Sequence, residues 1–96
     1  MDSYAKMEKK KEYYISTFDK KLILFKELLD SRNFKELKNF GHKLKGSGKS
    51  FGFDEISKLG KRIEDLAINM EEKTLIKAYE ELKDLFEYIK STYNKK

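Results

Sequence analysis

Residues 34–53 read FKELKNFGHKLKGSGKSFGF, and they hold the only histidine and four of the five glycines of this 96-residue chain. Apolar residues and glycines recur here at steps of three and four, at Phe34, Leu37, Gly41, Leu44, Gly48 and Phe51. That spacing is the period of an α-helix, and it predicts a helix over residues 34–50 with one face against a partner helix. A glycine inside a helix costs about 1 kcal/mol relative to alanine. Glycines on the partner face therefore indicate a close helix–helix approach.

Polar and glycine-containing turns bound this helix on both sides. Ser31 or Asn33 can cap its start, and Glu36 lies three residues after Asn33 as in a capping box. Gly52 suits the end of the helix, because glycine readily adopts the left-handed conformation that often follows the last turn. We expect Asp54 to cap the helix that follows.

The rest of the chain repeats the helical period. Residues 3–30 form one predicted segment, whose first ten residues form either a separate short helix or a frayed end. A third helix starts near residue 54 and carries Ile56, Leu59, Ile63, Leu66 and Met70, and a turn follows within residues 69–74. The last helix carries Leu75, Tyr79, Leu82, Leu85 or Phe86, Ile89 and Tyr93. We predict an all-α fold: a single domain over residues 1–96, built as an antiparallel up-down-up-down four-helix bundle with a short extra N-terminal helix.

Composition agrees with a helical bundle and excludes several kinds of site. Proline is absent, and 41% charged residues stand beside 39% hydrophobic residues. Without cysteine the chain can form neither disulfides nor thiolate metal sites. No apolar run reaches the roughly 20 residues of a membrane span, and residues 1–11 lack the apolar core of a signal peptide. We therefore expect a cytoplasmic protein. The net charge of +5 fits nucleic acid, an anionic membrane or an acidic protein equally well.

The histidine falls on the outer face of the predicted helix. On a wheel of about 100° per residue, His42 lies roughly 145° from the centre of the apolar face. A lone exposed histidine usually has no function, and a lysine-rich stripe is usually a solvated face. The histidine and the lysines together suggest phosphoryl chemistry, because a neutral imidazole is a nucleophile and nearby cations stabilise a phosphoryl group attached to it. The residues within about 60° of His42 on this face are Lys35, Lys38, Lys45, Gly46 and Lys49.

Three other chemistries do not fit the inventory. One histidine without cysteine leaves no convincing zinc site. Ser47 and Ser50 fall on other faces of the helix from His42, which argues against hydrolysis. Residues 46–50 read GSGKS, but the full phosphate-loop pattern and the strand that should precede it are both missing.

The motif resembles the signature of histidine-containing phosphotransfer (HPt) domains. In that signature a lysine follows the histidine by three residues and a glycine by four and by ten, as Lys45, Gly46 and Gly52 follow His42. The ending FGF at residues 51–53 is similar to the phosphotransfer domain of chemotaxis-type histidine kinases. The resemblance implies that His42 is the phosphoacceptor, that Lys45 stabilises the phosphate, and that Gly46 leaves room for a docking receiver domain.

In the chemotaxis-type domains a glutamate on the third helix orients the imidazole, and Glu64 stands at the matching position. The alternative interpretation of Glu64 is a surface pair with Lys61, and the sequence does not choose between the two. Lys61 itself stands where those domains often carry a second histidine, so the chain departs from their pattern at this position.

We expect a free-standing phosphoryl carrier of a two-component phosphorelay rather than an autonomous kinase. His42 would pass phosphate between receiver-domain aspartates of response regulators and hybrid histidine kinases. The chain would have no ATP site and no cofactor, and Mg²⁺ would belong to the partner receiver domain. Lys38, Gly46 and Lys49 are the expected docking residues, together with exposed apolar residues of the first segment: Ile15, Ile23 or Leu24.

Two other functions remain open from the sequence. One is a non-catalytic helical adaptor, including an HPt-like bundle without transfer activity. The other is a basic nucleic-acid-binding bundle, which the scarcity of arginine disfavours, since Arg32 and Arg62 are the only two. We expect a monomer that binds neither nucleic acid nor membrane.

Overall fold

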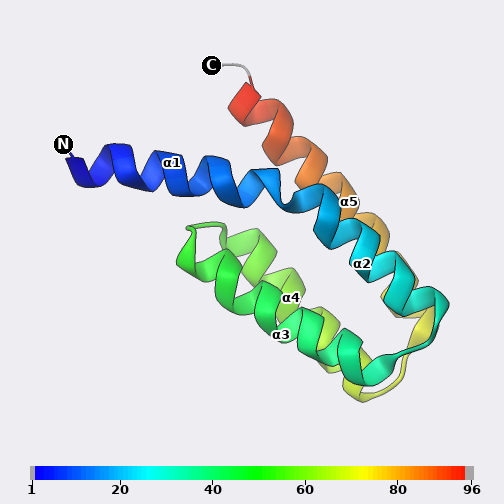
Figure 1. The fold of residues 1–96 in the computed structure, drawn as a ribbon. Coiled ribbons are helices and arrows are strands. Elements are labelled where there is room, and N and C mark those ends of the chain that lie inside the picture. Colours follow the sequence, from blue (N-terminus) through cyan, green and yellow to red (C-terminus); the bar gives the residue numbers. More distant parts are fainter. Residues whose placement is uncertain (1, 95–96) are drawn as a thin grey trace.

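Five α-helices make up the protein in a computed structural model that describes residues 2–94, with side chains from residue 8 to residue 93. They are α1 (Asp2–Ser16), α2 (Phe18–Asp30), α3 (Phe34–Ser50), α4 (Asp54–Ile68) and α5 (Glu72–Asn94). Helices α2 to α5 run alternately up and down, with α2 beside α5 and α3 beside α4 (Figure 1). The predicted all-α four-helix bundle with an additional N-terminal helix is confirmed. Within these residues every helix is too short or too polar to cross a lipid bilayer.

The first predicted segment is broken at Thr17 into two helices. Figure 1 shows α1 leaving the direction of α2 at this point. The amide of Thr17 bonds the carbonyl of Tyr14, three residues back, and the Thr17 hydroxyl donates to the same carbonyl. The Ser16 hydroxyl likewise donates to the carbonyl of Tyr13. Side-chain hydroxyls that occupy helix carbonyls bend or end a helix, so α1 is a longer and more distinct element than the sequence predicts.

All three turns between the bundle helices share one motif. Each places the second residue after the helix in the left-handed region: Arg32 (φ 52°), Gly52 (φ 81°) and Met70 (φ 52°). In each turn two amides bond backwards to carbonyls of the last helical turn, the pattern of a Schellman cap. These bonds are Asn33 N–Leu28 O and Arg32 N–Leu29 O, Phe53 N–Gly48 O and Gly52 N–Lys49 O, and Glu71 N–Leu66 O and Met70 N–Ala67 O.

Two predictions about the turns are wrong. Met70 was expected in the apolar face of the third helix, but it occupies the turn and is 66% exposed. Its place follows from the Schellman motif, which ends α4 at Ile68. Asp54 does not cap α4, because Phe53 is the capping residue and Asp54 is the first residue of the helix. The carboxylate of Asp54 there lies at the positive end of the helix dipole. Asn33 does cap α3, and its side-chain oxygen accepts a hydrogen bond from the Glu36 amide.

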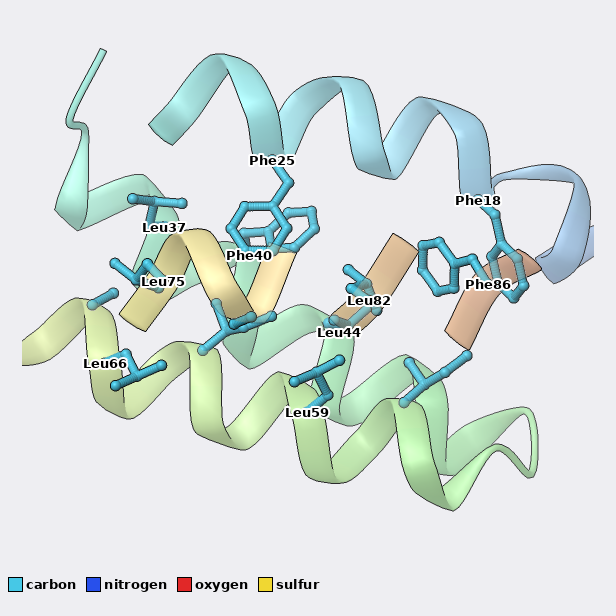
Figure 2. Packing of buried hydrophobic residues seen from close by; sticks show 14 of the residues in the cluster. Phe18, Phe25, Leu37, Phe40, Leu44, Leu59, Leu66, Leu75, Leu82 and Phe86 are labelled. Atoms are coloured by element: carbon cyan, nitrogen blue, oxygen red, sulfur yellow. The ribbon is translucent and has the colours of Figure 1, made fainter. Parts of the chain in front are cut away.

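Buried side chains from all four bundle helices form one core (Figure 2). Phe18 of α2 and Phe86 of α5 stack in parallel, with ring centroids 3.8 Å apart. Phe25 of α2 packs against Phe40 of α3 at 4.8 Å. No buried side-chain nitrogen or oxygen within the described residues lacks a hydrogen-bond partner. The fully buried large side chains are Phe18, Phe25, Phe86, Leu37, Leu44, Ile56, Ile63, Leu75 and Leu82.

Tyr14 fastens α1 to the turn between α3 and α4. Its ring is 2% exposed and stacks on Phe51 at 4.5 Å between centroids. Its hydroxyl forms a 2.7 Å hydrogen bond with the Ser47 hydroxyl on α3. The ammonium of Lys21 lies over the ring of Tyr14, 4.7 Å from its centroid, and donates a hydrogen bond to Thr17 Oγ1. Burial raises the pKa of Tyr14, against a smaller lowering by the Ser47 bond, and burial lowers the pKa of Lys21.

We expect Tyr14→Phe to lose about 1 kcal/mol of unfolding free energy at neutral pH, because the hydrogen bond between the Tyr14 hydroxyl and the half-buried Ser47 hydroxyl is lost. This loss should shrink in alkaline solution. A tyrosine whose pKa is raised by folding contributes full stability below its ordinary pKa, and that contribution is lost as the pH rises through the folded-state pKa. Wild type therefore declines faster than Tyr14→Phe above pH 10, the ordinary pKa of the group. Urea unfolding at a series of pH values measures both curves.

Tyr13→Phe is the matched control, because Tyr13 precedes Tyr14 on the same helix and its side chain is 67% exposed. It should follow the wild-type curve. A constant difference between wild type and Tyr14→Phe at all pH values would contradict the role given to the buried hydroxyl.

Candidate functional site

The site lies on the outer side of the α3–α4 pair, where glycines bring the two helices together. Gly41 and Gly48 of α3 and Gly60 of α4 are buried, and a Cβ atom built on any of them would collide with the backbone of the facing helix. The nearest such atom to Gly41 is the Glu64 nitrogen, at 2.5 Å, and the nearest to Gly48 is the Ser57 nitrogen, at 2.7 Å. The predicted close approach at Gly41 and Gly48 is present, and it fixes the register of α4 against α3.

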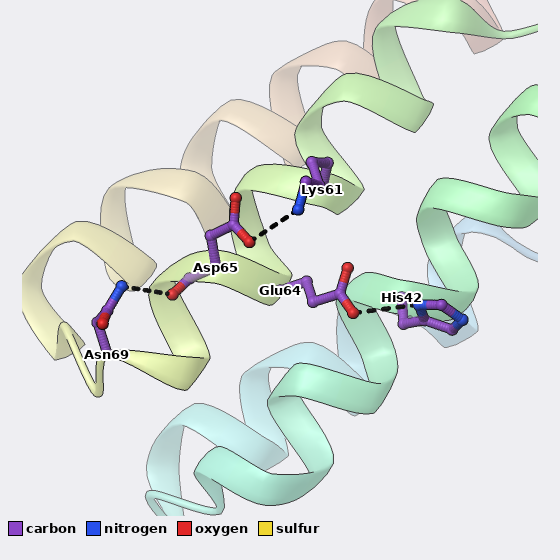
Figure 3. Close-up of polar contacts among 5 residues, drawn as sticks. All are labelled: His42, Lys61, Glu64, Asp65 and Asn69. Atoms are coloured by element: carbon purple, nitrogen blue, oxygen red, sulfur yellow. Dashed lines mark hydrogen bonds and ion pairs between the residues drawn. The ribbon is translucent and has the colours of Figure 1, made fainter.

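His42 of α3 and Glu64 of α4 meet across this contact (Figure 3). His42 Nδ1 lies 3.1 Å from Glu64 Oε2. The imidazole side chain is 65% exposed, whereas that of Glu64 is 14% exposed. Because a carboxylate oxygen only accepts, the hydrogen of a neutral ring resides on Nδ1. Nε2 then keeps its lone pair and, as Figure 3 shows, points away from α4.

The alternative pairing of Glu64 with Lys61 is not formed. The Lys61 ammonium bonds Asp65 Oδ1 at 3.0 Å, one turn further along α4. This hydrogen bond raises the pKa of Lys61. Figure 3 shows the two carboxylates on α4 directed to different partners, Asp65 to Lys61 and Glu64 to His42. Glu64 is therefore available to the imidazole.

Three lysines of α3 surround the histidine on its own helix. Lys38 precedes His42 by one turn, Lys45 follows it by one turn, and Lys49 follows by two. Lys45 is half-buried, and Lys38 and Lys49 are exposed. Within residues 8–93 none of the three forms an ion pair with a carboxylate, although six lysine–carboxylate or arginine–carboxylate pairs occur elsewhere. Their positive charge is therefore not compensated locally, and an incoming anion would meet it.

Gly46 keeps the surface beside His42 low. A Cβ atom built there would meet no other atom within 4 Å, in contrast to the three buried glycines. The backbone of Gly46 needs no glycine for conformational reasons, because it is an ordinary residue of α3. The absence of a side chain leaves the surface open to a second protein.

An apolar groove of about 300 Å³ lies between α2 and α3. Leu24 and Leu28 of α2 form one wall, and Phe40 and Lys43 of α3 form the other. Leu24 is 46% exposed, and its neighbour Ile23 is 60% exposed. The third apolar residue expected to be exposed, Ile15, is instead partly buried against the core, and it does not line the groove. Ile15 lies on the last turn of α1, next to Tyr14, which packs on Phe51 at the end of α3.

Sequence reasoning missed the groove itself. The wall residues Asn39 and Lys43 lie between the packed and the outer face of α3, where a helical wheel gives no decisive signal. Their role depends on how far α2 stands from α3, which is a tertiary property. No group of three or more side chains of the metal-binding types gathers anywhere in the described part of the chain.

One comparison with known proteins gives a match. A family model described as the Hpt domain matches residues 11–92, which include the whole bundle core, His42 and Glu64. Neither the curated proteins nor the solved structures contain a match to this chain.

We expect Glu64→Ala to change the tautomer of His42. Without the carboxylate, the ring hydrogen is no longer held on Nδ1, and the neutral ring redistributes it between both nitrogens. Nitrogen-15 NMR of the neutral imidazole, which is the only one in the chain, measures the two populations directly.

Glu55→Ala is the matched control, because it removes another carboxylate of α4, whose partner is Lys58 and not a residue beside His42. It should retain the wild-type tautomer. Equal tautomer populations in wild type and Glu64→Ala would show that the 3.1 Å contact does not orient the ring.

Proposed function

The chain belongs to the Hpt-domain family, whose members carry out histidine phosphotransfer, and from this we propose that it is a phosphoryl carrier of a two-component phosphorelay with His42 as phosphoacceptor. The observation that carries the proposal is the bond from His42 Nδ1–H to Glu64. It leaves Nε2 as an unprotonated nucleophile on a ring that is 65% exposed.

Transfer begins when Nε2 attacks the phosphorus of an aspartyl phosphate in a receiver domain. The new N–P bond forms as the P–O bond to the aspartate breaks, and the aspartate leaves as a carboxylate. The ring becomes positively charged while its Nδ1–H stays bonded to Glu64, whose negative charge stabilises it. The reverse sequence, with the aspartate of a second receiver as nucleophile, returns the ring to its neutral state. No proton has to leave the site in either direction.

Lys45 is the proposed phosphate-stabilising residue. It lies one turn from His42 on the same side of α3, and no carboxylate of the described residues competes for its ammonium. Lys38 and Lys49 extend the positive surface along the helix and favour the approach of an acidic partner site. We propose that Mg²⁺ and the in-line geometry are supplied by the receiver, whose carboxylates hold the metal, and that this chain acts without an ATP site or a cofactor of its own.

Docking uses the surface that runs from His42 over Gly46 to the groove between α2 and α3. Two apolar side chains line this groove, the exposed Leu24 and the partly buried Leu28, and they offer a hydrophobic contact beside the reacting nitrogen. The lysines surround this contact with positive charge. An apolar centre with a charged rim is the usual anatomy of a transient protein interface. Receiver domains of response regulators and hybrid kinases are the proposed partners.

We expect label to move from a receiver domain phosphorylated with acetyl phosphate to the wild-type chain and not to His42→Gln. A panel of purified receiver domains and gel autoradiography measure the transfer. Because His42 is the only histidine, phosphorus-31 NMR of the product should show a single phosphohistidine. Label that stays on every receiver, or that reaches His42→Gln as well as wild type, would defeat the carrier function and leave a non-transferring interaction bundle.

Gly46→Leu should slow transfer by about tenfold or more while the fold remains intact, which corresponds to about 1.4 kcal/mol of lost transition-state stabilisation. A Cβ atom at this position meets no atom of another helix within 4 Å, and leucine has a higher helix propensity than glycine. A slower transfer with unchanged stability would therefore arise at the partner contact. Stopped-flow or quenched transfer assays give the rate, and circular dichroism gives the stability.

Ser91→Leu is the control for added apolar volume, since Ser91 is exposed on α5, diagonally across the bundle from α3. It should transfer at the wild-type rate. If Gly46→Leu did so as well, the receiver would have to dock elsewhere.

A further inference from the structure

Two buried glycines lie next to the hydrogen-bonded pair His42 and Glu64. Gly41 directly precedes His42 on α3, and Gly60 precedes Glu64 by one turn on α4. Both are buried and face each other: a Cβ on Gly41 would lie 2.8 Å from the Gly60 carbonyl oxygen, and a Cβ on Gly60 would lie 2.8 Å from that of Gly41. The two backbones are therefore in direct contact at this level of the bundle.

Gly41 also contacts the residue that holds the imidazole. A Cβ on Gly41 would lie 2.5 Å from the Glu64 amide nitrogen and 2.9 Å from the Glu64 Cα. These are backbone atoms, so no side-chain rotation relieves the overlap. Non-bonded heavy atoms separate to about 3.5 Å, so a methyl group here would push the Glu64 backbone outward by roughly 1 Å.

A displacement of that size is large compared with what the hydrogen bond tolerates. His42 Nδ1 and Glu64 Oε2 are already 3.1 Å apart, near the upper end of ordinary N–H···O distances of about 2.7–3.2 Å. Glu64 is only 14% exposed, so its side chain is packed and cannot swing freely to restore the contact. The backbone position of Glu64 thus decides whether its carboxylate reaches the ring.

We propose that Gly41 is a positioning residue for the phosphoacceptor: by letting the Glu64 backbone rest against α3, it sets the reach of the Glu64 carboxylate to His42 Nδ1. Gly60 supports the same contact from α4. The effect on phosphotransfer rests on the function proposed above, whereas the effect on the ring tautomer does not.

Gly48 shows that close packing alone does not give a glycine this role. It makes the same kind of contact, with a Cβ 2.7 Å from the Ser57 nitrogen. Ser57, however, lies seven residues before Glu64, about 10 Å along α4. Alanine at Gly48 therefore strains the same helix pair at a level remote from the imidazole.

The test compares Gly41→Ala with Gly48→Ala by nitrogen-15 NMR of the neutral His42 ring and by transfer from a receiver domain phosphorylated with acetyl phosphate. Both variants should lose stability. Only Gly41→Ala should lose the Nδ1–H tautomer, and its rate per folded molecule should fall about ten- to a hundredfold, as expected for a 1 Å misplacement. Gly48→Ala should keep the wild-type tautomer and rate. Retention of both in Gly41→Ala, or their equal loss in the two variants, overturns the proposal.

Glu64→Asp tests the same idea without strain in the helix contact, should Gly41→Ala fail to fold. It leaves the Gly41 contact in place but withdraws the carboxylate by about 1.5 Å, one carbon–carbon bond. It should reproduce the tautomer loss of Gly41→Ala, and a wild-type tautomer in Glu64→Asp would show that reach is not critical. If no receiver phosphorylates the wild type, the function fails, yet the tautomer comparison still decides the role of Gly41.

Discussion

Backbone-to-backbone contact between α3 and α4 sets the geometry of the remaining parts of the molecule. Three glycines remove the side chains that would otherwise stand between these helices, and each costs about 1 kcal/mol of helix propensity. In exchange, the backbone contact specifies the register of α4 against α3 more tightly than side-chain packing between helices does. That register places a largely buried carboxylate beside a solvent-exposed imidazole, and the pair defines which ring nitrogen is free. The aromatic packing of α2 and α5 on the other side then closes the bundle behind this rigid unit.

How much of this could be predicted depends on whether a feature is local. The azimuth of His42 and Gly46 on α3 was predictable, because the helical period alone fixes which face a residue occupies. The Schellman turn at Gly52 was predictable too, since glycine is the residue that most readily adopts a positive φ. The same turn at Met70 was not, because a side chain gives no such signal, and Met70 was therefore placed wrongly in the core. The break at Thr17 depends on side-chain hydroxyls that bond to carbonyls of their own helix. The spacing of apolar residues does not reveal such bonds.

The pairing of Glu64 with His42 lies between these cases. From the residues alone, Glu64 could equally serve Lys61, and only the family resemblance favoured the imidazole. Two contacts in the structure resolve this. Within α4, Lys61 pairs with Asp65 one turn away. Between α3 and α4, Glu64 lies 3.1 Å from the imidazole, at the level where Gly41 and Gly60 bring the two backbones together. The glycines in the sequence predict that α3 and α4 approach closely. They do not predict which residue of α4 lies opposite which residue of α3, because this register depends on how the two backbones pack. The groove beside Leu24 was missed for the same reason, since it is a distance between helices rather than a property of one.

The glycines of α3 serve two opposite purposes, and which purpose a glycine serves depends on the face of the helix that it occupies. At Gly41 and Gly48 the missing side chain lets another part of this chain come close, and a Cβ atom would collide with it. At Gly46 the missing side chain leaves space that nothing in this chain fills. The inner glycines are therefore accounted for by the fold, but Gly46 lowers helix stability without any compensating contact within the protein. A glycine at an exposed helical position, beside lysines that form no ion pair within the described residues, fits the partner docking proposed above. Gly46 therefore supports docking by a partner protein more specifically than the net charge does, because that charge is compatible with partners of several kinds.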